Sequence, residues 1–162
     1  MLKKILISLL LITFCFAPNY SIAALRDELP PLERLSDLTI GIKRIEKGLK
    51  YEKKMKFDKA QKMYEEAISF LLKETKKQKI NANTYFYLGF AYDKLNDTNN
   101  SIIYYNLGLV VEPNNVNINK FLGNLYIKNN QPLKAKRLLE NIKNCNCDQY
   151  IELKNNIDNL NN

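Results

Sequence analysis

The chain has 162 residues, of which 26% are charged and 46% hydrophobic, and its formal net charge is +8 at pH 7. Histidine is absent, so the chain lacks the side chain that most often serves as general base and metal ligand. Only two of the three cysteines, Cys145 and Cys147, lie outside the N-terminal segment described below. Two cysteines without histidine do not favour a zinc site or a Cys–His nucleophile. We therefore expect no enzyme activity, no cofactor and no metal site.

The first 24 residues differ from the rest of the chain. Lys3 and Lys4 precede an apolar run over residues 5–16, and the small residues Ala23 and Ala24 follow. This order is typical of a secretory signal cleaved after Ala23 or Ala24, and it predicts a periplasmic or secreted protein. The alternatives are an uncleaved anchor, for which the run is shorter than the roughly 20 residues that a span needs, and lipid attachment at Cys15.

Cleavage of the signal would remove two lysines and no acids, leaving 25 − 2 = 23 basic and 17 acidic residues and a net charge of +6. The lysines are scattered among acidic residues and no arginine cluster occurs, which favours a solvated surface. We expect no nucleic-acid partner and no stable membrane span after cleavage.

A phrase of glycine, tyrosine three residues later and a small residue nine further occurs three times. The last two copies are 34 residues apart and the first two are 41 apart, one heptad more. A period of this size predicts stacked helix pairs, which build a surface rather than a catalytic site. The copies are Gly48…Tyr51…Ala60, Gly89…Tyr92…Ser101 and Gly123…Tyr126…Ala135.

Between Ala24 and the C-terminus we expect a lead-in, three repeats and a cap. The lead-in contains Pro30-Pro31, and the extra heptad lengthens the second helix of the first repeat through Lys79. In the second repeat we expect a helix from Ser101 with Val110 on its inner side. The ranges are 25–40 for the lead-in, 41–79, 82–115 and 116–147 for the repeats within 41–147, and 148–162 for an amphipathic capping helix.

The three glycines are expected in mid-helix, where each costs about 1 kcal/mol relative to alanine. Close helix packing explains such a cost, because a large ring can lie against a backbone without a side chain. We expect the rings of Tyr51, Tyr92 and Tyr126 to fill these places.

The phrases Tyr85…Leu88-Gly89…Tyr92…Ser101…Tyr105…Gly108…Pro113 and Leu122-Gly123…Tyr126…Ala135…Leu139 resemble tetratricopeptide repeats. The departures are the missing tryptophan, Ser101, Gly108, and Lys47 before Gly48. The resemblance implies an all-α, right-handed solenoid of about three helix-turn-helix units with a C-terminal capping helix. The ending around Cys145 and Cys147 also resembles a group of secreted bacterial tetratricopeptide proteins with paired cysteines.

The resemblance further implies a non-enzymatic scaffold that binds a peptide or protein on its concave face, which the first helices of successive pairs line. Phe86 and Phe90 lie one turn apart and are suited to anchor a partner, although they could instead pack against neighbouring pairs. The groove mapped onto this chain comprises Ile45, Leu49, Glu52, Phe86, Phe90, Asp93, Lys94, Lys120, Asn124, Ile127 and Lys128.

Cys145 and Cys147 carry the alternative function. In an oxidising compartment they can form a structural bridge that fixes the last repeat to its cap, or a bridge to another chain. As a reactive pair they would indicate a thiol-redox or metal-handling accessory protein. A purely architectural subunit of an envelope assembly is a third possibility.

Overall fold

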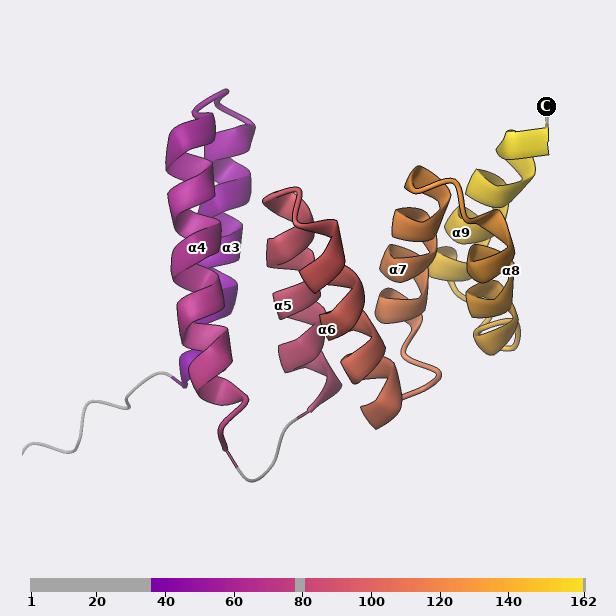
Figure 1. Ribbon diagram of the computed structural model, residues 1–162, viewed down its shortest axis with the longest axis horizontal. Helices are drawn as coiled ribbons and strands as arrows, with labels where there is room; N and C mark the ends of the chain where they lie inside the picture. Colours follow the sequence, from indigo (N-terminus) through magenta and orange to yellow (C-terminus); the bar gives the residue numbers. More distant parts are fainter. Residues whose placement is uncertain (1–35, 78–80, 162) are drawn as a thin grey trace, which may run out of the picture. The chain divides into compact units, whose positions relative to one another are not determined.

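The computed structural model describes residues 36–77 and 81–161, and the predicted signal peptide and Pro-Pro segment lie outside these ranges. All regular elements in the described part of the chain are helical, so the all-α prediction is confirmed (Figure 1). They are α3 (Asp37–Glu52), α4 (Phe57–Glu74), α5 (Ala82–Lys94), α6 (Thr98–Val111), α7 (Val116–Lys128), α8 (Pro132–Asn141), α9 (Asp148–Asp158) and the 3-10 turn η2 (Asn159–Asn161).

The helices pack as consecutive pairs. Helix α3 packs on α4, α5 on α6 and α7 on α8, and each pair contacts the next through α4–α5 and α6–α7 (Figure 1). The first helices of successive pairs also touch, α3 with α5 and α5 with α7. This nearest-neighbour packing is that of a solenoid of helical repeats, as the sequence predicts.

Helix α9 covers the last pair by packing on both α7 and α8. Its inner side is apolar, since Leu153 is fully buried and Ile157 nearly so. Three polar contacts reinforce it, each joining residues 32 apart: Lys120 with Glu152, Asn124 with Asn156, and Asn117 with Gln149. None of the helices in the described ranges combines the length and apolar character that a membrane crossing requires.

Two helices begin earlier than the sequence predicts. Helix α3 begins at Asp37, because Ser36 Oγ accepts a hydrogen bond from the Thr39 amide at 3.1 Å. Helix α6 begins at Thr98 rather than at Ser101, because Asp97 Oδ1 accepts from the Asn100 amide at 3.1 Å.

The prediction that the second helix of the first repeat continues unbroken through Lys79 is wrong, because α4 ends at Glu74. Part of the extra heptad lengthens this helix, and the rest separates α4 from α5 in the sequence. Helix α4 runs 14 residues past Ala60, whereas α6 runs 10 past Ser101, which accounts for four residues. The stretch from 75 to 81 has seven residues and that from 112 to 115 has four, which accounts for the other three.

The three phrase glycines lie inside α3, α5 and α7 and are buried, so mid-helix placement is confirmed. A Cβ on Gly48 would lie 2.6 Å from the Tyr64 ring, and one on Gly89 would lie 2.6 Å from the Tyr105 ring. No real Cβ sits that close to a neighbour, so these helices approach to a distance that only glycine allows.

The prediction that Tyr51, Tyr92 and Tyr126 supply the rings was wrong. The rings that face Gly48 and Gly89 are those of Tyr64 and Tyr105, which lie on the second helix of each pair. Each tyrosine follows its glycine by 16 residues in the sequence. At Gly123 the neighbour is Leu153 of α9, which would lie 2.6 Å from an added Cβ, so the cap takes the place of a ring.

Each of these earlier tyrosines instead closes a turn with its carbonyl. The amides of Lys56, Asp97 and Gln131 donate to the carbonyls of Tyr51, Tyr92 and Tyr126 at 3.0, 2.9 and 2.8 Å. The residue before each donor has a left-handed backbone, with φ of 55° at Met55, 59° at Asn96 and 56° at Asn130. These are equivalent helix ends of the Schellman type, at which asparagine is favoured over other side chains.

Met55 is therefore the least suited residue at the three equivalent turns. Its side chain is 73% exposed, so it contributes little packing. We predict that Met55→Asn stabilises the protein by about 0.5 to 1 kcal/mol, because asparagine tolerates the left-handed region better. Urea unfolding followed by circular dichroism measures this change.

The reverse exchange at an equivalent turn, Asn96→Met, is the matched control and is expected to destabilise by a similar amount. A loss of stability in Met55→Asn would contradict the equivalence of the turns.

Candidate functional site

The predicted groove residues of the first two pairs come together where α3 faces α5. Leu49, Phe86 and Phe90 are half-buried, and Ile45 is almost fully buried beneath them. They line a pocket of about 140 Å³, hereafter the α3–α5 pocket. Its remaining walls are Ile42, Glu46 and Tyr87.

The two phenylalanines also contact the next pair, as the alternative interpretation expected. The ring centroid of Phe121, on α7, lies 5.3 Å from that of Phe86 and 5.6 Å from that of Phe90, both in edge-to-face arrangements. Phe86 is also 6.2 Å from Tyr105 in the core. Phe86 and Phe90 thus have one side in the inter-repeat packing and one side in the α3–α5 pocket.

Phe121 was not among the predicted groove residues. It precedes Leu122 of the packing stripe, and no part of the repeated phrase marks it. The residue that corresponds to Phe121 in the second repeat is Tyr87, which precedes Leu88 and lines the pocket. Comparison of the two copies could therefore have identified this position.

One turn beyond Leu49 and Phe90, Glu52 and Lys94 connect the first pair to the second. Lys94 Nζ donates to Glu52 Oε2 at 2.8 Å, and both side chains are partly exposed. An exposed pair of this kind stabilises a fold by only about 0.2 to 1 kcal/mol. Its partners can therefore exchange for charges on a bound molecule at small cost.

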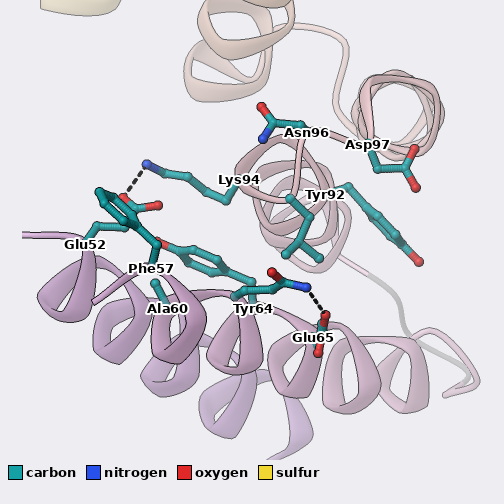
Figure 2. A pocket seen from close by; sticks show the side chains of 11 residues that line it. Glu52, Phe57, Ala60, Tyr64, Glu65, Tyr92, Lys94, Asn96 and Asp97 are labelled. Atoms are coloured by element: carbon teal, nitrogen blue, oxygen red, sulfur yellow. Dashed lines mark hydrogen bonds and ion pairs between the residues drawn. The ribbon is translucent and has the colours of Figure 1, made fainter. Parts of the chain in front are cut away.

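The same pair borders a second, more polar hollow of about 460 Å³, hereafter the turn pocket. Figure 2 shows its walls from α3, α4 and the turn between α5 and α6, with dashed lines for the Lys94–Glu52 pair and for Gln61 donating to Glu65 at 2.9 Å. Its lining residues are Glu52, Phe57, Ala60, Gln61, Tyr64, Glu65, Tyr92, Lys94, Leu95, Asn96 and Asp97.

Tyr64 lies along the wall of the turn pocket with only 1% of its surface exposed (Figure 2). Its hydroxyl makes no hydrogen bond of standard geometry within the described residues. Burial raises the pKa of this hydroxyl above its ordinary value of 10.0, and the nearby Glu52 carboxylate raises it further. Tyr64 also packs on Gly48 of α3.

The predicted groove residues of the third pair are largely engaged by the chain itself. Lys120 pairs with Glu152 at 2.7 Å and lies over the Phe121 ring, and Asn124 accepts from Asn156 at 2.9 Å. Helix α9 occupies this position because it packs against α7 as a further first helix would. Lys120 and Asn124 therefore contact α9 at the surface where the sequence predicts the groove.

The three remaining predicted groove residues do not lie together. Ile127 is half-buried against the core, Lys128 is exposed at the end of α7, and Asp93 is half-buried beside Lys94 on α5. None of the three lines either of the two pockets described above.

Cys145 and Cys147 form a disulfide between α8 and α9, with Cα atoms 5.2 Å apart. Cys147 is the residue that precedes the first turn of α9, and both cysteines are half-buried. In the described ranges, no group of three or more His, Cys, Asp or Glu side chains is placed so that it could hold a metal ion.

Comparison with known families agrees with the repeat geometry. Residues 82–115, which contain the α5–α6 pair and the connection to α7, match the tetratricopeptide repeat family. Comparison with curated proteins finds no match to this chain. The matched unit and the consecutive helix pairs support a tetratricopeptide-repeat protein, and such repeats generally mediate protein–protein interaction.

Titration of Tyr64 provides a test of the turn-pocket wall. In the unfolded chain a tyrosine ionises near pH 10, while the folded state holds its proton to higher pH. The stabilisation is complete below about pH 10 and is lost as the pH rises above it. We predict that Tyr64→Phe changes stability little at about pH 7 and retains more of it at about pH 11, measured by urea unfolding.

Tyr105 has a pKa raised mainly by burial, so Tyr64→Phe removes only part of the alkaline loss. An alkaline loss as large in Tyr64→Phe as in the native protein would show that Tyr64 is not held in this environment.

Proposed function

We propose that the chain is a non-enzymatic binding module that holds a protein or peptide partner in the groove between α3 and α5, on the face that the resemblance makes concave. The observation that supports this most directly is the α3–α5 pocket. It combines aliphatic side chains from one pair with phenylalanine rings from the next, and the rings remain half-buried.

The chemistry of the groove favours a partner with an apolar anchor residue. Burial of an apolar side chain contributes about 25 cal/mol per Å² removed from water, and aromatic walls add contact at low entropy cost. The pocket of about 140 Å³ has room for one such side chain rather than a small-molecule substrate. Glu52 and Lys94, one turn away, would fix its orientation through polar contacts.

We further propose that the protein acts in the cell envelope or outside the cell. This proposal rests on the first 24 residues, whose basic start, apolar run and small residues are those of a secretory signal. Mass determination of the protein purified from its own cells tests it, since cleavage after Ala23 or Ala24 is expected. An intact N-terminus would contradict it.

The groove is tested by photo-crosslinking in living cells. A photoreactive residue in place of Tyr87, which lines the pocket, is expected to capture a partner identified by mass spectrometry. Adding Phe90→Ala is expected to lower the cross-linked yield about tenfold or more, because a buried aromatic anchor contributes over 1 kcal/mol.

Phe70 on α4 is the matched control, since it is also a half-exposed phenylalanine and lines neither pocket. A photoreactive residue there should not capture the same partner, and Phe70→Ala should leave the yield unchanged. Equal capture at both positions, or a yield unaffected by Phe90→Ala, would rule out the groove.

A thiol-redox role is the second candidate, favoured by the disulfide between Cys145 and Cys147. In such a role the disulfide would accept two electrons and two protons from a partner dithiol, which would become a disulfide. The resulting thiol pair could also bind a soft metal ion. Thiol titration of the purified protein after incubation with reduced glutathione tests this, and a pair that stays oxidised would end it.

A further inference from the structure

Helix α6 has an apolar outer face. Its exposed positions recur at helical spacing, and four of the six are aliphatic: Ile103 at 52% exposure, Leu107 at 39%, Val110 at 81% and Val111 at 48%. The other two are Asn99 and Asn106. The prediction that Val110 lies on the inner side was wrong, because Tyr105 and Gly108 occupy that side.

This face, hereafter the α6 stripe, is also uncharged. No residue from Thr98 to Val111 is acidic or basic, whereas every other α-helix in the described ranges carries at least two charged side chains. A helix that exposes its apolar side chains to water without charged neighbours departs from ordinary surface helices. Contiguous exposed apolar surface of this kind marks an interaction site.

The rest of the described chain leaves the stripe uncovered. Helix α6 packs on α5 and α7, and its backbone does not come close to that of α4 or α8. The stripe is therefore separate from the α3–α5 pocket, which α6 does not line.

We propose that the α6 stripe is a self-association surface, on which a second copy of this chain packs through its own α6. Leu107 lies midway between Ile103 and Val111 in sequence, so a two-fold axis at Leu107 pairs the helices antiparallel. Leu107 then meets its own copy, and Ile103 meets Val110 and Val111 of the second copy. Such a symmetric contact requires a surface that is complementary to itself.

Both chemical features of the stripe meet this requirement. The chain has a net positive charge, +8 in full and 25 − 2 − 17 = +6 after the expected cleavage, and an uncharged helix offers a second copy contact without like charges facing each other. The carboxamide of asparagine both donates and accepts, so Asn106, one residue from the axis at Leu107, can pair with its own copy, which lysine or glutamate cannot do. Asn106 spends one amide hydrogen on the Ile102 carbonyl at 2.8 Å and retains its oxygen and second hydrogen.

Other occupants fit the stripe less well. A strongly acidic or basic partner would find no complementary charge on α6. A membrane-surface helix typically carries lysine and arginine beside its apolar face, and α6 carries neither. The neutrality of the stripe thus favours a second copy.

The association is expected to be reversible. Helix α6 has 14 residues and is about 21 Å long, so one stripe on another buries less than the roughly 1,600 Å² of a standard interface. We therefore expect a monomer–dimer equilibrium that depends on concentration rather than an obligate dimer.

Sedimentation equilibrium of the protein purified after expression of the full sequence tests the proposal. Leu107→Lys is expected to raise the dimer Kd about a hundredfold, because two like charges would be buried at the two-fold axis. Leu107→Glu should have the same effect. An equimolar mixture of the two variants should regain the dimer, since lysine then faces glutamate, and this recovery separates loss of the interface from loss of folding.

Leu133→Lys is the matched control, because Leu133 is an apolar residue of α8 that is 72% exposed, and it should leave the dimer unchanged. Three results would overturn the proposal: a native protein that stays monomeric at all accessible concentrations, a dimer unaffected by Leu107→Lys, or a mixture that remains monomeric. Cross-linking from position 107 that yields only a different protein or lipid would overturn it as well.

Discussion

The contact between a tyrosine ring and a bare glycine backbone is the interaction on which the rest of this structure depends. In the first two pairs the ring lies where a Cβ would stand, so the two helices approach more closely than any other residue would allow. The cost is about 1 kcal/mol of helix propensity at each glycine. It is offset because Tyr64 and Tyr105 become almost completely buried and fix how each second helix sits on its first.

The α3–α5 pocket follows from this arrangement. With each pair fixed internally, α3 and α5 lie side by side, and side chains one turn apart on each helix converge in the α3–α5 pocket. The third pair ends the array differently, because Leu153 of α9 meets Gly123 and three polar contacts join α9 to α7. The cap thereby covers part of the surface of α7, the first helix of the last pair.

The sequence predicted the elements better than their contacts. Period and glycine spacing identified the helix pairs, since these depend on local pattern. Phe86 and Phe90, predicted from their spacing of one helical turn, both line the α3–α5 pocket. The identity of the rings over the glycines could not be read from spacing alone, because Tyr51 and Tyr64 both follow Gly48 and only the crossing of the helices decides between them. The contacts of Lys120 and Asn124 with the cap could not be predicted for a similar reason, since their partners lie 32 residues away in the sequence. Val110 was misplaced because an evenly apolar helix gives no periodic signal.

A double-mutant cycle on Gly89 and Tyr105, followed by urea unfolding, tests the central contact most directly. With Tyr105 in place, Gly89→Ala should destabilise the protein by about 1 to 3 kcal/mol, because the added methyl group meets a ring that has no room to move. In the Tyr105→Ala background the same substitution should become neutral or stabilise by up to about 1 kcal/mol, the ordinary helix preference for alanine. An effect of Gly89→Ala that is equal in both backgrounds would contradict the account.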